Sequence, residues 1–249
     1  MSDASIRIAM WSGPRNISTA MMRSFEARGD CAVSDEPFYA AYLAATGLDH
    51  PMRAEVLASQ PLDWREVARA MVGPAPGAKP IWYQKHMTQH MIAGFGLEWS
   101  DGLANAFLIR APEATLASYA QKRVHFTLDE IGLPAQVALF ERAADRLGKA
   151  PPVIEGADVL ARPAQTLSAL CRALDIPYTP KMLAWAPGRR ASDGVWAPAW
   201  YDSVERSTGF GPPPTEATLN DLDDALKRIA EAARPLYEHL ARHKLSSLP

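Results

Sequence analysis

The residues best suited to chemistry stand together near the start of the chain, in the run Gly13-Pro-Arg-Asn-Ile-Ser-Thr19. The run follows an apolar stretch, 6–11, that predicts a strand, and it leads into an amphipathic pattern that predicts a helix. A loop between a strand and a helix presents unpaired backbone N–H groups, and the helix dipole adds positive charge there. Arg15 adds a full charge, while Ser18 and Thr19 offer hydroxyls that can also cap the helix. This order of residues indicates a site for a phosphate or a sulfonate.

The run departs from the Walker pattern G-x-x-x-x-G-K-[ST] at a decisive position. That pattern needs a Lys directly before the Ser or Thr, where it reaches the β- and γ-phosphates. Here the corresponding triplet is Ile17-Ser18-Thr19. The sequence therefore disfavours a nucleoside triphosphatase or an ordinary kinase. A plain strand-turn-helix connection with a chance hydroxyl cap is the alternative interpretation of the run taken alone.

A second segment with a cation follows the predicted strand at 105–109. Arg110 ends that strand, Pro112 suits the first turn of a helix, and Ser118 lies eight residues after Arg110. A guanidinium at a strand end and a hydroxyl two turns into the next helix can converge on one phosphate. Taken alone, the segment is equally compatible with a solvent-facing Arg and an ordinary helical Ser.

A candidate base and a further cation follow two other predicted strands. Glu36 comes shortly after the stretch 31–34, and Lys85 directly follows the stretch 80–84. Because the carboxyl ends of parallel strands meet at one edge of a sheet, these side chains are expected to face the loop Gly13–Thr19 across a crevice. Glu36 is a candidate general base, and an ordinary carboxylate at a helix start is the alternative.

Two histidines, His86 and His90, stand close after Lys85 and are the other candidates for the base. Their spacing of four residues would also suit a metal ion, but no third ligand is evident in a chain with two cysteines. We therefore expect no metal site.

Together, these segments resemble the sulfotransferase family, whose members transfer a sulfonate group from 3′-phosphoadenosine 5′-phosphosulfate (PAPS). The run Gly13–Thr19 is similar to the family's 5′-phosphosulfate loop, a Pro-Lys/Arg-Ser-Gly-Thr/Ser-Thr sequence, with Asn16 and Ile17 in place of the usual Ser-Gly. The spacing of Arg110 and Ser118 is similar to that of the family's 3′-phosphate site.

A third segment, 152–163 leading into 166–177, resembles the family's strand, acidic turn and Leu-rich helix, with Asp175 in place of a Gly. This segment is architectural rather than catalytic. The resemblance therefore spans roughly residues 5–180.

The resemblance implies a role for each candidate. The role of Glu36 follows bacterial members, and a histidine base follows the cytosolic branch of the family. Glu36 would deprotonate the acceptor, with His86 as its substitute, and Lys85 would neutralise charge on the bridging oxygen. Arg110 and Ser118 would hold the 3′-phosphate of PAPS, the donor co-substrate. The other donor contacts would come from Gly13, Pro14, Arg15, Asn16, Ile17, Ser18 and Thr19 and, from a weakly matching basic loop, Arg189.

Strand-like and helix-like stretches alternate along the chain, which predicts an α/β fold with a parallel sheet flanked by helices. The resemblance adds the three-layer P-loop architecture of sulfotransferases. We expect a single domain over residues 1–249, with 185–214 as a lid or acceptor-binding loop and 215–244 as a C-terminal helix. The expected strands are 6–11, 31–34, 80–84, 105–109 and 153–155, and the expected helices before the last are 18–28, 37–46, 64–72, 112–122, 134–148 and 164–174.

Composition narrows the class of protein. The net charge of −2 gives no bulk attraction to nucleic acid, and no apolar run is long enough to span a membrane. Cys31 and Cys171 are too few for a disulfide framework, and the first predicted strand starts too early to leave room for a signal peptide. We therefore expect a cytoplasmic protein that acts on a small-molecule acceptor, without nucleic acid or membrane as a partner.

Two other functions stay open. The first is an ATP-dependent small-molecule kinase of the P-loop class, with Asp35 or Glu36 as base and a need for Mg²⁺. The second is a non-catalytic nucleotide-binding protein of the same fold, because Ile17 replaces a loop glycine. The aromatic residues within 185–201 indicate a partly apolar or sugar-like acceptor, whose identity the sequence leaves open together with the oligomeric state.

Overall fold

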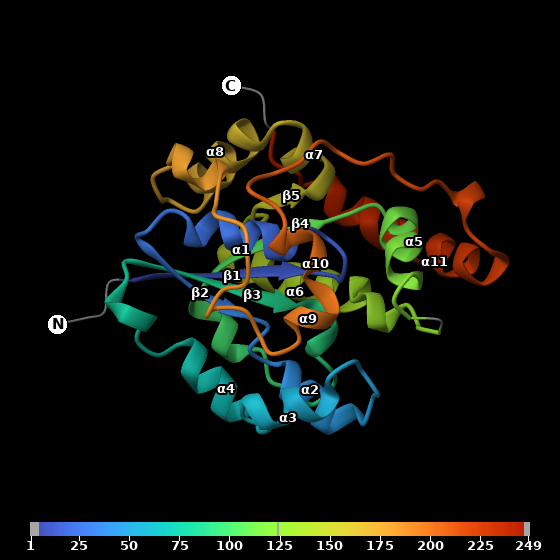
Figure 1. The fold of residues 1–249 in the computed structure, drawn as a ribbon, viewed down its shortest axis with the longest axis horizontal. Coiled ribbons are helices and arrows are strands. Elements are labelled where there is room, and N and C mark those ends of the chain that lie inside the picture. The colour runs from blue at the N-terminus through green and yellow to red at the C-terminus, as the bar shows by residue number, and fades with distance from the viewer. Residues whose placement is uncertain (1–4, 124, 247–249) are drawn as a thin grey trace.

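Five parallel strands form the centre of the molecule (Figure 1). The structure is a computed structural model and describes residues 5–123 and 125–246; the remaining parts of the predicted domain 1–249, residues 1–4, 124 and 247–249, lie outside the described residues. The strands lie side by side in the order β2-β3-β1-β4-β5. Their bounds are β1 Ile6–Ser12, β2 Cys31–Asp35, β3 Ile81–Met87, β4 Ala104–Ile109 and β5 Val153–Glu155.

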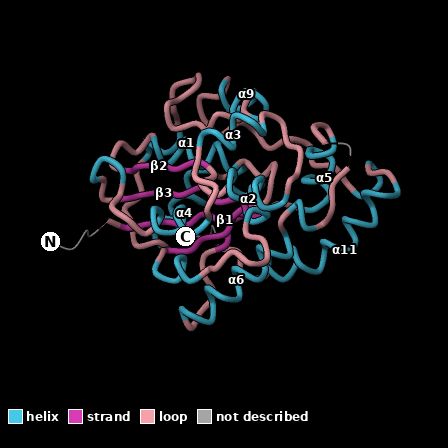
Figure 2. Tube along the Cα trace, turned by 90° about the horizontal axis from the view of Figure 1, so that it is seen from below, coloured by secondary structure: helices cyan, strands magenta, loops and turns pink. Residues whose placement is uncertain are grey.

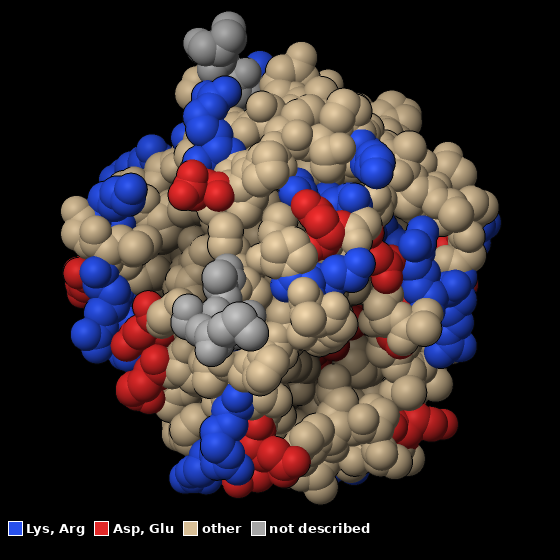
Figure 3. All heavy atoms as spheres, turned by 90° about the vertical axis from the view of Figure 1, so that its left-hand side faces the viewer, with Lys and Arg blue, Asp and Glu red and all other residues tan. Residues whose placement is uncertain are grey.

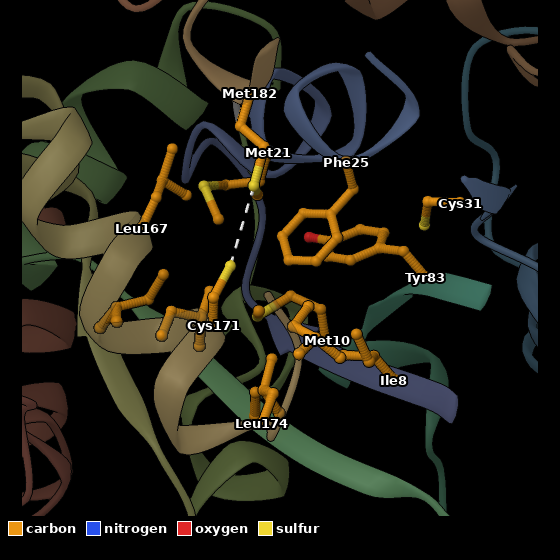
Figure 4. Packing of buried hydrophobic residues seen from close by; sticks show 14 of the residues in the cluster. Ile8, Met10, Met21, Phe25, Cys31, Tyr83, Leu167, Cys171, Leu174 and Met182 are labelled. Atoms are coloured by element: carbon orange, nitrogen blue, oxygen red, sulfur yellow. Dashed lines mark hydrogen bonds between the residues drawn. The ribbon is translucent and has the colours of Figure 1, made fainter. Parts of the chain in front are cut away.

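Helices cover both faces of the sheet (Figure 2). Their bounds are α1 Ser18–Glu26, α2 Tyr39–Thr46, α3 Arg53–Ser59, α4 Trp64–Met71, α5 Pro112–Ala120, α6 Leu133–Leu147, α7 Gly156–Ala161, α8 Pro163–Ala173, α9 Ala197–Trp200, α10 Asp202–Glu205 and α11 Asp224–Ala241. Because successive strand residues point to opposite faces, Met10 packs with α1 and α8, as Figure 4 shows, while Trp11 packs with α5, α6 and α11. The predicted α/β fold with three layers is confirmed.

Strand β3 runs three residues beyond the predicted stretch 80–84, and this extension decides where two candidate residues point. Lys85 and His86 become successive residues of one strand, so their side chains leave the sheet on opposite faces. Lys85 stands in register with Asp35 of β2, whereas His86 stands in register with Trp11 of β1. The two residues therefore meet different surroundings.

The last helix starts later than predicted. α11 begins at Asp224 rather than near residue 215, because Asp223 caps it by accepting a hydrogen bond from the N–H of Leu226 at 2.8 Å. A short 3-10 turn over Leu219–Asp221 precedes the cap. In the described structure, residues 211–218 form neither helix nor strand.

Residues 185–214 lie against the carboxyl ends of the strands and carry the short helices α9 and α10 (Figure 1). The segment is fastened in two places. Ala184, directly before it, forms a bridge with Gly209, and the buried Arg23 of α1 pairs with Asp193 at 2.6 Å. It is thus an ordered part of the molecule.

Basic and acidic side chains lie interspersed on the face drawn in Figure 3, in keeping with the small net charge of −2. That face therefore presents charges of both signs rather than one. None of the helices within the described ranges is both long enough and apolar enough to cross a membrane.

Candidate functional site

A cavity of about 630 Å³ lies at the carboxyl ends of the strands, where open parallel sheets bind their ligands. Its walls come from the loop after β1, from the ends of β2, β3 and β4, from α5, and from residues within 196–217. The sequence-predicted residues that it brings together are Pro14, Arg15, Asn16, Ile17, Ser18, Thr19, Glu36, Lys85, His90, Arg110 and Ser118. Gly13, His86 and Arg189 are not among the residues that line it.

Gly13 shapes the loop from behind. A Cβ atom at this position would lie 2.6 Å from the carbonyl oxygen of Ile131, so only glycine lets the loop pack this closely against that turn. Asn16 fixes the loop to β4, because its side-chain amide donates to the carbonyl oxygen of Leu108 at 2.7 Å. The Oδ1 atom of Asn16 is buried and has no partner among the described residues. It is an unused hydrogen-bond acceptor at the base of the loop.

The backbone of the loop is strained. Arg15 and Ile17 adopt left-handed conformations, with φ of 58° and 42°. This region is costly for residues other than glycine, about 1–3 kcal/mol each, and most of all for a β-branched side chain such as Ile. The surroundings hold Ile17 in place, since its side chain packs against the core beside α1. The loop therefore keeps its shape without the family's usual glycine.

The predicted capping by Ser18 and Thr19 is wrong. Ile17 is the N-cap residue of α1 and makes no side-chain hydrogen bond, so Ser18 and Thr19 are the first two helical residues. Both line the cavity. The first turn of α1 consequently meets the cavity with backbone N–H groups that have no intrahelical partner. This is the arrangement that binds anions at helix N-termini.

Arg15 lies with Arg110 and Ser118 rather than over the start of α1. Its Nε donates to the Ser118 hydroxyl at 3.0 Å, and Arg110 Nη1 donates to the carbonyl oxygen of Arg15 at 2.6 Å. Burial lowers the pKa of Arg15, and the positive charge of Arg110 lowers it further. Two cations and a hydroxyl therefore converge at the β4 side of the cavity. The resemblance, in contrast, places Arg15 in the 5′-phosphosulfate loop and Arg110 with Ser118 at the 3′-phosphate.

Glu216 is a part of this cluster that the sequence analysis missed. Its Oε2 accepts from Arg110 Nη2 at 2.9 Å, and it lines the cavity. The residue lies 106 positions after Arg110, in the irregular segment before α11. No local pattern marks such a contact.

Lys85 has all three of its Nζ hydrogens engaged on the β2 and β3 side. They reach Asp35 at 2.8 Å, Glu36 at 2.6 Å and the Tyr201 hydroxyl at 2.8 Å. Asp35 and Lys85 are neighbours in register on adjacent strands, which explains their contact. Lys85 itself is 1% exposed, so its charge depends on these partners.

Tyr201 links Lys85 to the segment 185–214. Its hydroxyl donates to Asp35 and accepts from Lys85 and from the indole N–H of Trp196, at 3.0 Å for the last. Asp35 also accepts from the backbone N–H of Gly194 at 3.0 Å. Asp35 and Tyr201 are therefore the structural frame of Lys85, and the sequence analysis identified neither role.

The cluster holds one excess negative charge, and the pKa values respond to it. Burial raises the pKa of Glu36, and Asp35 raises it further, while Lys85 opposes the shift. Burial works against the charge on Lys85, but Asp35 and Glu36 outweigh it and raise the pKa of Lys85 well above the ordinary value. Glu36 therefore has an increased affinity for a proton, as a general base requires.

His86 lies in the core and does not reach the cavity. It is 1% exposed, its ring stacks on Trp11 at 4.7 Å, and its Nε2 lies 3.1 Å from the side-chain oxygen of Gln84. Burial lowers the pKa of His86 to about 3. The extension of β3 is the reason, because it turns His86 to the opposite face from Lys85. His86 is thus not positioned to replace Glu36.

His90 and His50 form an aromatic wall with Tyr39 and Tyr42. The His90 ring lies 4.8 Å from each tyrosine ring, and its Nε2 is 4.0 Å from Glu36 Oε2. Burial holds the pKa of His90 well below its usual value, and burial also lowers the pKa of His50 to about 4. Burial therefore favours the neutral form of both imidazoles. His50, which the sequence analysis did not single out, accepts or donates a 2.8 Å hydrogen bond with the Tyr39 hydroxyl.

Two further expectations concern Arg189 and metal ions. Arg189 is exposed, and the structure does not bring it to the cavity. Within the described ranges, no three His, Cys, Asp or Glu side chains are gathered as a metal ion would require.

Comparison with known proteins adds an independent finding. A family described as "Sulfotransferase domain" matches residues 6–243. The chain is 37% identical over 240 residues to branched-chain-amino-acid aminotransferase-like protein 1 of Arabidopsis thaliana, and 34% identical to protein 2 of the same name. Each alignment covers 95% of this chain, but the chain spans only 42% and 41% of those relatives.

Among solved structures, a sulfotransferase from Alicyclobacillus acidocaldarius shares the fold. It has a TM-score of 0.52 at 12% identity, over 97% of this chain and 98% of that one. At this identity the likeness speaks for the fold alone. Because the family match covers nearly the whole described chain, from β1 to the end of α11, the chain belongs to the sulfotransferase domain family.

Proposed function

We propose that the chain transfers a sulfonate group from PAPS to a hydroxyl or amine of a small, uncharged acceptor. One observation carries this proposal. The sheet order sets the N-terminus of α1 between a cluster of two arginines and a serine at the end of β4 and a lysine–carboxylate cluster at the ends of β2 and β3. PAPS has a phosphosulfate flanked on one side by a 3′-phosphate, and it needs cations at both.

The donor roles follow from this layout. The first turn of α1, with Ser18 and Thr19, suits the 5′-phosphosulfate, since its N–H groups and hydroxyls can donate to several oxygens. Arg110, Arg15 and Ser118 suit the 3′-phosphate, because two guanidinium groups and a hydroxyl meet there. Gly13, Asn16 and Ile17 hold the loop in shape.

Glu36 and Lys85 are the proposed catalytic residues. In the transfer step Glu36 takes the proton of the acceptor hydroxyl, the acceptor oxygen bonds to sulfur, and the bond from sulfur to the bridging oxygen breaks. Adenosine 3′,5′-bisphosphate leaves. A protonated Glu36 holds Lys85 less strongly, so one Nζ hydrogen becomes available for the bridging oxygen. Proton uptake and stabilisation of the leaving group are thereby coupled through one lysine.

The acceptor side of the cavity is aromatic, and among the described residues that line it no positive charge lacks a partner. Tyr39, Trp196 and Trp200 line it, and burial favours the neutral form of the nearby His50 and His90. An anionic acceptor would meet the excess negative charge beside Glu36. We therefore propose an uncharged acceptor with an apolar body, bound under residues 185–214. We also propose that the chain acts as a single domain and without a metal ion.

Transfer of labelled sulfonate from PAPS to a panel of uncharged alcohols, phenols and amines tests this proposal. We expect a labelled product together with adenosine 3′,5′-bisphosphate, and weaker bisphosphate binding in Arg110→Ala but not in Arg228→Ala, an exposed arginine of α11. Loss of the charge-assisted pair is expected to reduce affinity by about 10–100-fold. A protein that neither binds the bisphosphate nor transfers label would overturn the proposal.

A further inference from the structure

Arg110 is engaged on two sides at once. Its Nη1 holds the loop through the carbonyl oxygen of Arg15, and its Nη2 pairs with the Glu216 carboxylate at 2.9 Å. A guanidinium binds carboxylate and phosphate through the same fork of N–H groups. Glu216 therefore occupies the edge of Arg110 that a phosphate at this cluster would use.

The segment that carries Glu216 is irregular between two fixed ends. Residues 211–218 form no helix or strand in the described structure, and Pro212, Pro213 and Pro214 stiffen the stretch before Glu216. The Glu216 side chain is 31% exposed, against 17% for Arg110, so it can return to water more easily than its partner. The two ends of this segment are fixed. The bridge of Gly209 to Ala184 holds one end, and the capping box of Thr218 and Asp221 holds the other.

Charge balance favours replacement of the Glu216 carboxylate by the phosphate over binding of both anions at Arg110. Arg15 and Arg110 carry two positive charges, and Glu216 supplies one negative charge. A phosphate monoester carries about −1.5 to −2, so it balances both arginines by itself. If Glu216 stayed in place, the phosphate would meet a carboxylate at the same guanidinium edge, and the two anions would repel each other.

We infer that Glu216 is an intramolecular competitor for the 3′-phosphate at Arg110, a residue that tunes donor affinity and helps to expel the bisphosphate product. This inference rests on the proposed function and deepens it. Donor binding moves Glu216 and its segment off Arg110, and the returning carboxylate then opposes rebinding of the product, which keeps the same 3′-phosphate.

The test measures binding of adenosine 3′,5′-bisphosphate and of 5′-AMP by calorimetry, with the wild type, Glu216→Gln and Glu231→Gln. Glu231 is an exposed residue of α11, so its variant matches the charge change away from the cavity. We expect Glu216→Gln to bind the bisphosphate about tenfold more tightly, the effect of one charge-assisted pair. Glu216→Gln should leave the affinity for 5′-AMP unchanged, and Glu231→Gln should leave the affinity for both nucleotides unchanged.

A double variant locates the effect. In the Arg110→Ala background, Glu216→Gln should no longer change the affinity for the bisphosphate, because the group for which it competes is gone. Unchanged or weaker bisphosphate binding by Glu216→Gln would overturn the inference, and so would an equal gain for 5′-AMP. If no variant binds either nucleotide, the proposed donor fails instead, which separates the two failures.

Discussion

Glu36 is a largely buried carboxylate, with 12% of its side chain exposed, beside a lysine that Asp35 already neutralises. Because burial raises the pKa of Glu36 above its ordinary value near 4.5, its contribution to stability is complete below that pH and is lost as the pH rises through the raised value. Glu36→Gln should therefore raise the melting temperature at pH 8, with the gain shrinking toward pH 4.5. Turnover should fall by about 10²–10⁴-fold, because the base is gone. Thermal melts from pH 4.5 to 8 and sulfonate transfer at pH 7.5 measure the two effects; a variant that keeps full turnover would pass the base role to His90.

Tyr201 and Tyr83 allow a matched comparison, since both are buried tyrosines with different hydroxyl environments. The Tyr201 hydroxyl contacts Lys85, Asp35 and Trp196, whereas the Tyr83 hydroxyl has no partner among the described residues. Tyr201→Phe should lower the free energy of unfolding by about 1.5–3 kcal/mol, because it removes hydrogen bonds to charged groups. Tyr83→Phe should leave the stability unchanged or raise it. Urea denaturation measures both, and equal losses would mean that the network around Lys85 contributes nothing specific.

The loop between β1 and α1 depends on its contact with the turn at Ile131. Gly13→Ala would set a methyl group 2.6 Å from a backbone oxygen, which cannot move as a flexible side chain can. We expect a loss of about 1–3 kcal/mol in stability. Gly102→Ala is the control, because a Cβ there has nothing within 4 Å. Denaturation midpoints measure both variants. A Gly13→Ala protein as stable as the control would show that the turn yields without cost.

Local patterns were sufficient to place the five strands and the helices α1, α2, α4, α5, α6 and α8, but they did not predict the short helices α3 and α7. The rule that the carboxyl ends of parallel strands meet at one edge of a sheet predicted that Glu36, Lys85 and Arg110 lie close together, and all three line one cavity. The rule failed for His86, since the strand continued through it and alternation turned it inward. Tyr201 and Glu216 could not be predicted at all. They contact Lys85 and Arg110 across 116 and 106 positions, and such contacts depend on tertiary packing rather than on spacing.

At the scale of the whole molecule, attraction for a polyanion is expected from the charges that line the cavity and not from the net charge. The net charge is −2, yet the cavity lining combines Arg15, Lys85 and Arg110 with two carboxylates, Glu36 and Glu216. No lysine precedes Ser18 to hold a triphosphate. Adenosine 3′,5′-bisphosphate should therefore raise the melting temperature without added metal, a chelator should not reduce the shift, and ATP with Mg²⁺ should stabilise less. Thermal shift at fixed ionic strength measures all three, with 5′-AMP as the control for the 3′-phosphate. Greater stabilisation by ATP with Mg²⁺ would favour the kinase, and equal stabilisation by 5′-AMP would remove the 3′-phosphate from Arg110.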